Sequence, residues 1–328
     1  MWPVSVRQYA RKVPPFHEPQ HNMEQTWASV DLGSHTARLL IARRLGPSGP
    51  LIPLLRKREY IRLAQGLSPE GVIGPDLCER VLGVFRRFSY LLADFRVQQV
   101  RGAATGVFRK AVNAGQLLKL IEVETGIPIR IIPGEMEAML SGRGALGAMD
   151  FKGEEFTVFD LGGGTTEFFY GSGEGEKARS LPFGAAGLTR SFIHADPPDE
   201  TELNAVSREI DKRLEDERME LPSGGILIGT GGSVTTLAAM LHRVPREEIT
   251  PERINGLELT HARVSRCLER MCRIRSQERT RLHGLDPERA HVIVAGTLVV
   301  MGIMGYVETS SLFASMSDLL EGLLMIGD

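Results

Sequence analysis

The pattern of apolar and polar positions predicts a chain in which strands and helices alternate. Apolar runs of strand length occupy residues 26–32, 38–42, 51–63, 97–101, 127–132, 156–160, 168–170, 177–182, 225–228 and 311–314. Apolar residues at helical spacing occupy residues 75–95, 113–126, 135–148, 184–194, 199–219, 234–241, 260–281, 287–306 and 317–326, with Asn113 and Asp199 as expected N-caps. This alternation is typical of α/β layers.

One glycine-rich hairpin stands out between two of the predicted strands. The apolar segment that ends at Asp160 is followed by three glycines, two threonines and then Glu167. Glycines in such a turn leave backbone N–H groups free to converge on an anion. Carboxylates on both sides are suited to holding a metal ion or positioning water. The hairpin therefore indicates phosphate chemistry.

Two further glycine turns fit the same chemistry. Asp31 begins a similar turn between two strands, 129 residues before Asp160. At residues 229–233 a strand leads through several glycines into the start of a helix, where free backbone N–H groups are suited to binding phosphate. Two matching hairpins predict two related lobes. We expect a mobile N-terminal extension at 1–25, a first lobe at 26–148, a second at 149–310, and a C-terminal strand and helix at 311–328 that return to the first lobe.

Composition and charge narrow the class of protein. Hydrophobic residues make up 42% of the 328 residues and charged residues 24%, as in globular proteins. A net charge of -2 argues against nucleic acid or a membrane as a partner. The three cysteines show neither disulfide nor metal-binding spacing, which fits a reducing cytoplasm. We find no apolar run of membrane-spanning length.

A series of short motifs follows in order along the chain. They are Asp31–Leu39, Ala104–Arg109, Gly134–Leu140, Asp160–Glu167, Gly229–Leu237, Leu285–Ala290 and Glu321–Leu324. Together they resemble the exopolyphosphatase/guanosine pentaphosphate phosphatase family of the actin-like ATPase superfamily. The resemblance covers residues 26–328 and implies a two-lobed actin-like (ribonuclease H-like) fold. In that fold mixed sheets are flanked by helices and the active site lies in the interlobe cleft.

The resemblance also implies an activity, a cofactor and partners. The activity is Mg²⁺-dependent hydrolysis of terminal phosphate from inorganic polyphosphate, with another divalent cation as a substitute for Mg²⁺. The alternatives are a phosphohydrolase that removes the 5′ phosphate of pppGpp, and a weakly active or nonhydrolytic sensor that binds polyphosphate or a nucleotide. A homodimer is compatible with the resemblance.

The same motifs imply roles for individual residues. Glu137 would orient or deprotonate the attacking water and Glu167 would assist it. Asp31 and Asp160 would hold the metal ion. The predicted phosphate-binding residues are Gly33, Ser34, His35, Arg38, Thr105, Arg109, Gly162, Gly163, Gly164, Thr165, Gly231, Gly232 and Ser233.

Several positions depart from the family pattern. His35 stands for Asn, Gly106 for Ser, Met136 for Glu, Met139 for Arg, Gly187 for Arg, His291 for Asp, and Ser317-Asp318 for Arg-Gly. At least three polar or charged groups are lost from segments that border the cleft in the family. These losses favour altered substrate preference or the sensor alternative, whereas the retained Glu137 favours the enzyme.

Overall fold

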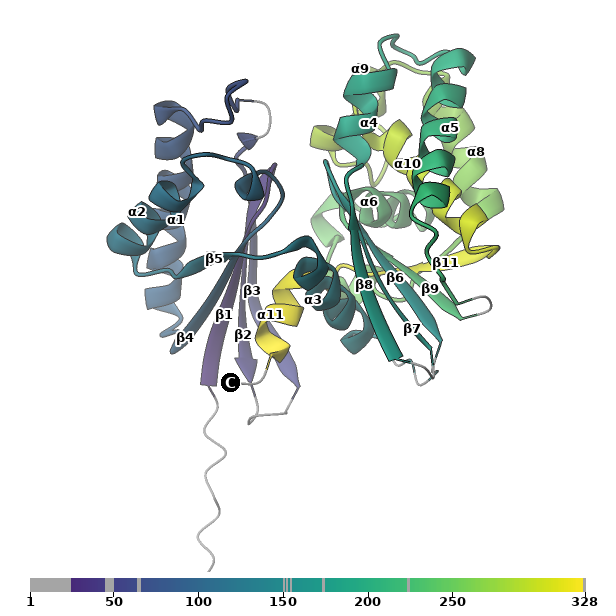
Figure 1. Ribbon diagram of the computed structural model, residues 1–328. Coiled ribbons are helices and arrows are strands. Elements are labelled where there is room, and N and C mark those ends of the chain that lie inside the picture. Colours follow the sequence, from purple (N-terminus) through teal and green to yellow (C-terminus); the bar gives the residue numbers. More distant parts are fainter. Residues whose placement is uncertain are drawn as a thin grey trace, which may run out of the picture.

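The computed structural model contains two mixed β-sheets side by side, each covered by helices on its outer face (Figure 1). The structure describes residues 25–44, 50–63, 66–149, 151, 153, 155–172, 175–222 and 225–326. The predicted extension at 1–25 lies outside these residues except for Gln25, which begins the first strand. Among the described residues, no helix is both long and apolar enough to cross a membrane.

The first sheet has the strand order β3-β2-β1-β4-β5. Its strands are β1 (Gln25–Leu32), β2 (Thr36–Arg44), β3 (Leu51–Tyr60), β4 (Gln99–Ala104) and β5 (Ile129–Ile131). β1, β2 and β3 form an antiparallel meander, and β4 and β5 continue from β1 in parallel. Helices α1 (Pro75–Asp94) and α2 (Ala114–Thr125) bury Phe85, Phe88 and Ile121 against the outer face of this sheet.

The second sheet has the order β10-β11-β9-β6-β7-β8. Its strands are β6 (Phe156–Leu161), β7 (Thr166–Ser172), β8 (Gly175–Leu181), β9 (Ile226–Thr230), β10 (Glu258–Thr260) and β11 (Ser311–Ala314). Its outer helices are α4 (Ala185–Phe192), α5 (Glu200–Asp216), α6 (Gly232–Leu241), α7 (Pro251–Ile254), α8 (His261–Cys272), α9 (Ser276–Arg279) and α10 (Ile293–Tyr306). The largest hydrophobic cluster lies here, around the apolar helix α10.

Two helices lie between the sheets, α3 (Gly134–Gly147) and α11 (Leu319–Met325) (Figure 1). α11 packs on the first sheet, where Leu320 and Leu324 contact Trp27 and Leu40. α3 packs on the second sheet, where Ala145 joins the cluster of β6 and β7. The C-terminal helix thus lies on the first sheet, and the helix that follows β5 lies on the second.

Glycines allow α3 and α11 to approach each other closely. A methyl group at Gly144 would lie 2.0 Å from the carbonyl oxygen of Asp318, and one at Gly322 would lie 2.0 Å from that of Leu140. Backbone contact at these distances excludes any side chain. The helix crossing therefore depends on both glycines.

Four predictions were wrong. The C-terminal strand, expected to return to the first lobe, is β11 of the second sheet and pairs in parallel with β9. The helix predicted at 260–281 is split after Cys272, because the Asp196 carboxylate accepts hydrogen bonds from the Ser276 backbone N–H (2.8 Å) and hydroxyl (2.6 Å). The segment after Pro287 forms a short 3₁₀ turn before α10 begins at Ile293. Asn113 does not cap α2 with its side chain, which instead bonds to the backbone of Ile73 at 2.9 Å.

We predict that Gly322→Ala lowers the free energy of unfolding by about 1–3 kcal/mol, because the added methyl forces the two helices apart. Denaturant unfolding measures the loss. Gly83→Ala is the matched control, since its methyl would meet only the end of the Arg87 side chain at 3.8 Å. Within a helix that change should raise stability by about 0.5–1 kcal/mol. Equal losses in both variants would contradict the role of the crossing.

Candidate active site

The two predicted hairpins have matching geometry. The N–H of Gly33 donates to the carbonyl of Thr36 at 2.9 Å, and that of Gly162 donates to the carbonyl of Thr165 at 3.0 Å. In each hairpin the carboxylate before the turn has a charged partner directly across the strands. Asp31 lies opposite Arg38 in the first. In the second, residue 160 lies opposite residue 167.

Arg38 joins the first hairpin to the start of α11. Its Nε and Nη2 atoms lie 2.8 and 2.7 Å from Oδ2 of Asp31. Its Nη1 donates to Asp318, which also caps α11. Arg38, predicted as a phosphate ligand, is thus shared between two carboxylates. Asp318 was noted in the sequence only as a departure from the family pattern, inside the helix expected at 317–326; in the structure it is the N-cap of α11.

Glu137 is held by Arg109. The carboxylate lies in the first turn of α3 and is only 9% exposed. Nη1 of Arg109 donates to its Oε2 at 2.6 Å and reaches the carbonyl of Ile132 at 3.4 Å. The structure therefore brings two predicted site residues together, as an ion pair. Thr105, also predicted, is buried beside them.

Serine hydroxyls hold the two carboxylates of the second hairpin. Ser141 of α3 donates to Oδ2 of Asp160 at 3.0 Å, and Ser180 of β8 donates to Oε1 of Glu167 at 2.9 Å. Neither serine was predicted from the sequence. Ser180 lies directly opposite Glu167 in the β7–β8 hairpin, so the hairpin register could have located it, whereas no spacing signal connects Ser141 to Asp160. α3 thus contributes both Glu137 and the serine that orients Asp160.

Burial raises the pKa of four carboxyl groups in the site, those of Asp31, Glu137, Asp160 and Glu167. The pKa of Asp160 rises to about 7, through burial and the negative charges of Asp318 and Glu137, against which Arg38 acts. The pKa of Glu167 lies well above its usual range, through burial and its neighbours Glu137 and Asp160. Burial also raises the pKa of Asp31 and Glu137, each opposed by its arginine. These buried carboxyl groups therefore tend to keep their protons or to attract cations.

The donor set is compatible with Mg²⁺. No group of three or more His, Cys, Asp or Glu side chains suited to a metal ion occurs within the described part of the chain. Mg²⁺ in phosphate-processing sites is usually held by only one or two carboxylates, with phosphate oxygens and water as the other ligands. Oδ1 of Asp31 is buried and has no hydrogen-bond partner among the described residues, so it is a free ligand atom.

The turn at residues 33–36 contacts the segment 104–109. The N–H of Val107 donates to the hydroxyl of Ser34 at 2.9 Å. Gly106 has φ +58°, and a methyl group there would lie 2.2 Å from that hydroxyl oxygen. The glycine at a family serine position therefore permits this contact. Ser34, predicted to bind phosphate, also links two loops.

The third glycine turn lies against the second hairpin. Gly231 has φ +89°, and a methyl group there would lie 2.9 Å from Oδ1 of Asp160. A methyl group at Gly232 would overlap the guanidinium of Arg289, 1.7 Å from its Cζ. Ser233 is buried in the first turn of α6. Arg289 is thus a cation at the glycine turn that the sequence analysis left without a role, although it belongs to the Leu285–Ala290 motif.

The glycines of the second hairpin are supported by α4. The N–H groups of Ala185 and Ala186 donate to the carbonyls of Gly162 and Gly163 at 3.1 and 2.9 Å. The N–H of Gly187 also donates to the carbonyl of Gly163, at 2.9 Å. Gly187, where the family has Arg, therefore supports the turn through its backbone. Gly164 completes the turn, and a methyl group there would meet nothing within 4 Å.

The two lobes contact each other beside the turn at residues 33–36. The ring of His35 packs edge-on against Tyr60, with centroids 5.5 Å apart. The Tyr60 hydroxyl lies 2.5 Å from Oδ2 of Asp286, and Arg62 pairs with Glu288. Burial and neighbouring arginines lower the pKa of His35, and burial likewise lowers that of His291. The two histidines are therefore neutral at pH 7.

The two methionine departures have different environments. Met136 is 44% exposed in the first turn of α3. Met139 packs between α3 and α11, in contact with the clusters of both sheets. At position 139 an apolar side chain that packs against both clusters thus stands in place of the family's arginine. Nothing in the structure explains the loss of the glutamate at Met136.

Solved structures of known proteins assign the fold. The chain superposes on the Ppx/GppA family member from Aquifex aeolicus with a TM-score of 0.80 at 29% identity, covering 92% of this chain and 97% of that one. It superposes on an exopolyphosphatase from Cytophaga hutchinsonii with a TM-score of 0.81 at 25% identity, covering 92% and 96%. The protein thus has the predicted two-lobed, actin-like ATPase fold.

Sequence comparison gives the family. The sequence model of the Ppx/GppA phosphatase family matches residues 41–326, and the chain belongs to this family. Exopolyphosphatase 2 of Mycobacterium tuberculosis is 30% identical over 286 residues, 83% of this chain and 88% of that protein. A bifunctional 3-dehydroquinate synthase/phosphatase of Fusobacterium nucleatum is 27% identical over 92% of this chain and 46% of that protein. The chain is therefore an exopolyphosphatase-like phosphoanhydride hydrolase.

We predict that Asp160→Asn stabilises the metal-free protein at pH 8. An unfolded aspartate ionises near pH 3.8, whereas Asp160 in the folded protein keeps its proton up to about pH 7. Its contribution to stability is therefore complete below pH 3.8 and is lost as the pH rises through 7. The variant should gain on the order of 1–3 kcal/mol over wild type at pH 8, and the gain should shrink towards pH 4.

Thermal unfolding of both proteins across this pH range measures the difference. Ser180→Ala is a control that keeps all carboxylates. A gain that is the same at pH 4 and pH 8 would contradict the electrostatic explanation.

Proposed function

We propose that the protein releases the terminal phosphate of inorganic polyphosphate in a Mg²⁺-dependent reaction. Phosphoryl transfer requires an in-line water, charge neutralisation and positioning rather than covalent catalysis. The buried carboxylates and the glycine turns of both lobes supply groups of these kinds. The exopolyphosphatase relatives support polyphosphate as the substrate.

The Arg109–Glu137 pair is the observation that carries the proposal. Glu137 is buried, bonded to an arginine at 2.6 Å, and within electrostatic reach of Asp31, Asp160 and Glu167. Burial raises the pKa of Glu137 and Arg109 opposes the rise, so the carboxylate is a stronger proton acceptor than an exposed glutamate. We assign it the orientation of the attacking water, with Glu167 assisting.

The remaining roles follow from position. Arg109 donates to one carboxylate in the free protein and presents its remaining N–H groups to an incoming phosphate. Asp31 and Asp160 would hold the Mg²⁺ ion, which supplies neutralisation of phosphate charge when bound. Within the turns at 33–36, 162–166 and 231–233, N–H groups other than those of Gly33 and Gly162, which close the hairpins, would cradle phosphate oxygens.

The 5′ phosphate of pppGpp is the alternative substrate, since the same terminal phosphoanhydride would enter the same turns. A nonhydrolytic sensor is the second alternative, favoured by the lost charges at Met136 and Met139. We also propose a cytoplasmic location, with no nucleic-acid or membrane partner, and leave a homodimer as a prediction.

We predict that Glu137→Gln lowers phosphate release from polyphosphate by about 10²–10⁴-fold, because the proton acceptor is lost. Phosphate release is measured with Mg²⁺, using polyphosphate and pppGpp as separate substrates. The matched control is Glu135→Gln, a solvent-exposed carboxylate in the same turn of α3, which should retain wild-type rates.

The outcomes separate the three functions. Faster release from pppGpp than from polyphosphate would favour the nucleotide substrate. Binding of either compound without release above the Glu137→Gln background would favour the sensor. Wild-type activity of Glu137→Gln would contradict the assignment of the water-orienting residue.

A further inference from the structure

Asp318 brings a carboxylate to a position where the family pattern has glycine. The residue is only 3% exposed and lies at the start of α11, between the two sheets. The proposed chemistry does not use this carboxylate. Because burying a charged group is costly unless it is paired, its contacts indicate what it does.

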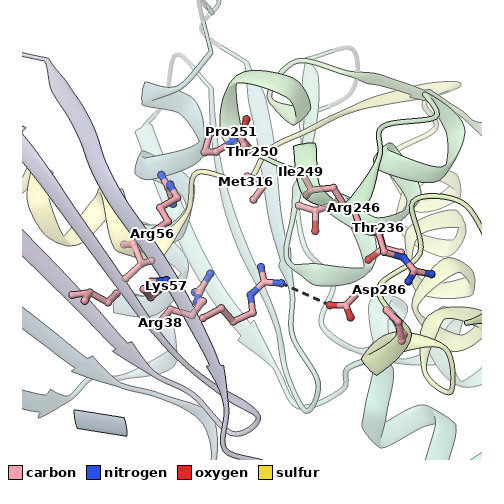
Figure 2. A pocket seen from close by; sticks show the side chains of 15 residues that line it. Arg38, Arg56, Lys57, Thr236, Arg246, Ile249, Thr250, Pro251, Asp286 and Met316 are labelled. Carbon is pink, nitrogen blue, oxygen red and sulfur yellow. Dashed lines mark ion pairs between the residues drawn. The ribbon is translucent and has the colours of Figure 1, made fainter. Parts of the chain in front are cut away.

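The contact that distinguishes Asp318 is its bond to Arg38. Arg38 lies on β2 and lines a cavity of about 440 Å³ between the lobes (Figure 2). Its Nε and Nη2 atoms lie 2.8 and 2.7 Å from Oδ2 of Asp31, and its Nη1 donates to Oδ2 of Asp318. All three guanidinium nitrogens are therefore engaged by carboxylates of the protein itself. One positive charge is shared between two acidic groups, so little of it remains for an incoming anion.

The electrostatics of the site reflect this pairing. Burial lowers the pKa of Arg38, but the charges of Asp318, Asp31 and Asp160 oppose burial and raise the pKa above its usual range, Asp318 most strongly. After burial, the charge of Asp318 is also the largest contribution that raises the pKa of Asp160. The charge of Asp318 is therefore felt in both hairpins.

Asp318 is fixed in place by α11 and by the helix crossing. Its N–H donates to Oε2 of Glu321 at 3.0 Å, and its Oδ1 accepts the N–H of Leu320 at 3.2 Å. Its carbonyl oxygen lies against Gly144 of α3, where a methyl group would approach to 2.0 Å. The two carboxylate oxygens thus have separate functions, since Oδ1 caps α11 and Oδ2 holds Arg38.

We propose that Asp318 is a positioning residue that restrains Arg38 and so lowers the affinity of the first lobe for phosphate. With glycine at this position, Nη1 of Arg38 would be free to donate to a phosphate oxygen. With Asp318 in place, the phosphate must compete with a fixed carboxylate, whose negative charge also repels it. This inference rests on the proposed binding of phosphate at the turn of residues 33–36, but not on its hydrolysis.

Asp318→Asn tests the proposal with little change of shape. Asparagine keeps an oxygen that caps α11 and replaces Oδ2 with an NH₂ group, which cannot accept a bond from Arg38. In isothermal titration of the metal-free full chain, the variant should bind tripolyphosphate about tenfold more tightly than wild type, because one charge-assisted bond becomes available. With Mg²⁺ present, KM for polyphosphate should fall by a similar factor while kcat stays within about threefold, as expected for added uniform binding.

Two further variants support the interpretation. Asp318→Ser also provides a helix cap but no second acceptor, so it should show the same gain in affinity. Asp199→Asn is the matched control. Asp199 caps α5 through the same kind of capping box, is solvent-exposed, and makes no ion pair within the part of the chain that the structure describes. This control should leave tripolyphosphate affinity and KM unchanged.

A double-variant comparison identifies the group through which Asp318 acts. In an Arg38→Gln background, Asp318→Asn should raise tripolyphosphate affinity by no more than about twofold, because the restrained donor is absent. The same gain with and without Arg38 would attribute the effect to the loss of a negative charge alone and overturn the proposal.

Two other results would also overturn it. One is unchanged or weaker tripolyphosphate binding in both Asp318→Asn and Asp318→Ser. The other is a lower kcat with unchanged KM, which would make Asp318 part of the reaction itself. If wild type and variants release no phosphate at all, the proposed function fails, whereas the titration still decides whether Asp318 restrains Arg38.

Discussion

The backbone contact between α3 and α11 is the constraint on which the rest of the structure depends. Two glycines, Gly144 and Gly322, allow the helices to cross without intervening side chains. Because α3 packs on one sheet and α11 on the other, the crossing joins the two halves of the molecule. It also places two acidic groups, since Glu137 lies in the first turn of α3 and Asp318 caps α11. A packing contact far from the solvent thus determines where the charges of the cleft lie.

Once these helices are in place, the site is dominated by buried negative charge. Burial in a medium of low polarity raises the pKa of Asp31, Glu137, Asp160 and Glu167, and neighbouring carboxylates raise it further. Arg38 and Arg109 only partly offset this, each by pairing with specific carboxylates. Such a cluster is costly for the free protein. It is suited to a reaction in which a cation enters together with phosphate, because the cation offsets the charge of the carboxylates.

The departures from the family pattern have local physical explanations at several positions. Gly106 allows the Ser34 hydroxyl to approach the neighbouring loop, and Gly187 supports the second hairpin through its N–H group. Met139 fills space between the central helices. These substitutions preserve the framework of the site while reducing its positive charge. Arg289, at the third glycine turn, shows that cations remain at other points of the cleft.

The alternating elements, the two glycine hairpins and the family could all be predicted from the sequence, because hydrophobic periodicity and turn chemistry are local properties. The C-terminal helix packs on the first sheet, whereas the strand before it pairs within the second sheet, contrary to the prediction that both return to the first lobe. Only the tertiary structure decided which side chains meet. The pairing of Arg109 with Glu137, the bond from Ser141 to Asp160 and the link from Arg38 to Asp318 all join different elements of the fold. No local pattern encodes such contacts, since they arise from the packing of α3, α11 and the two sheets.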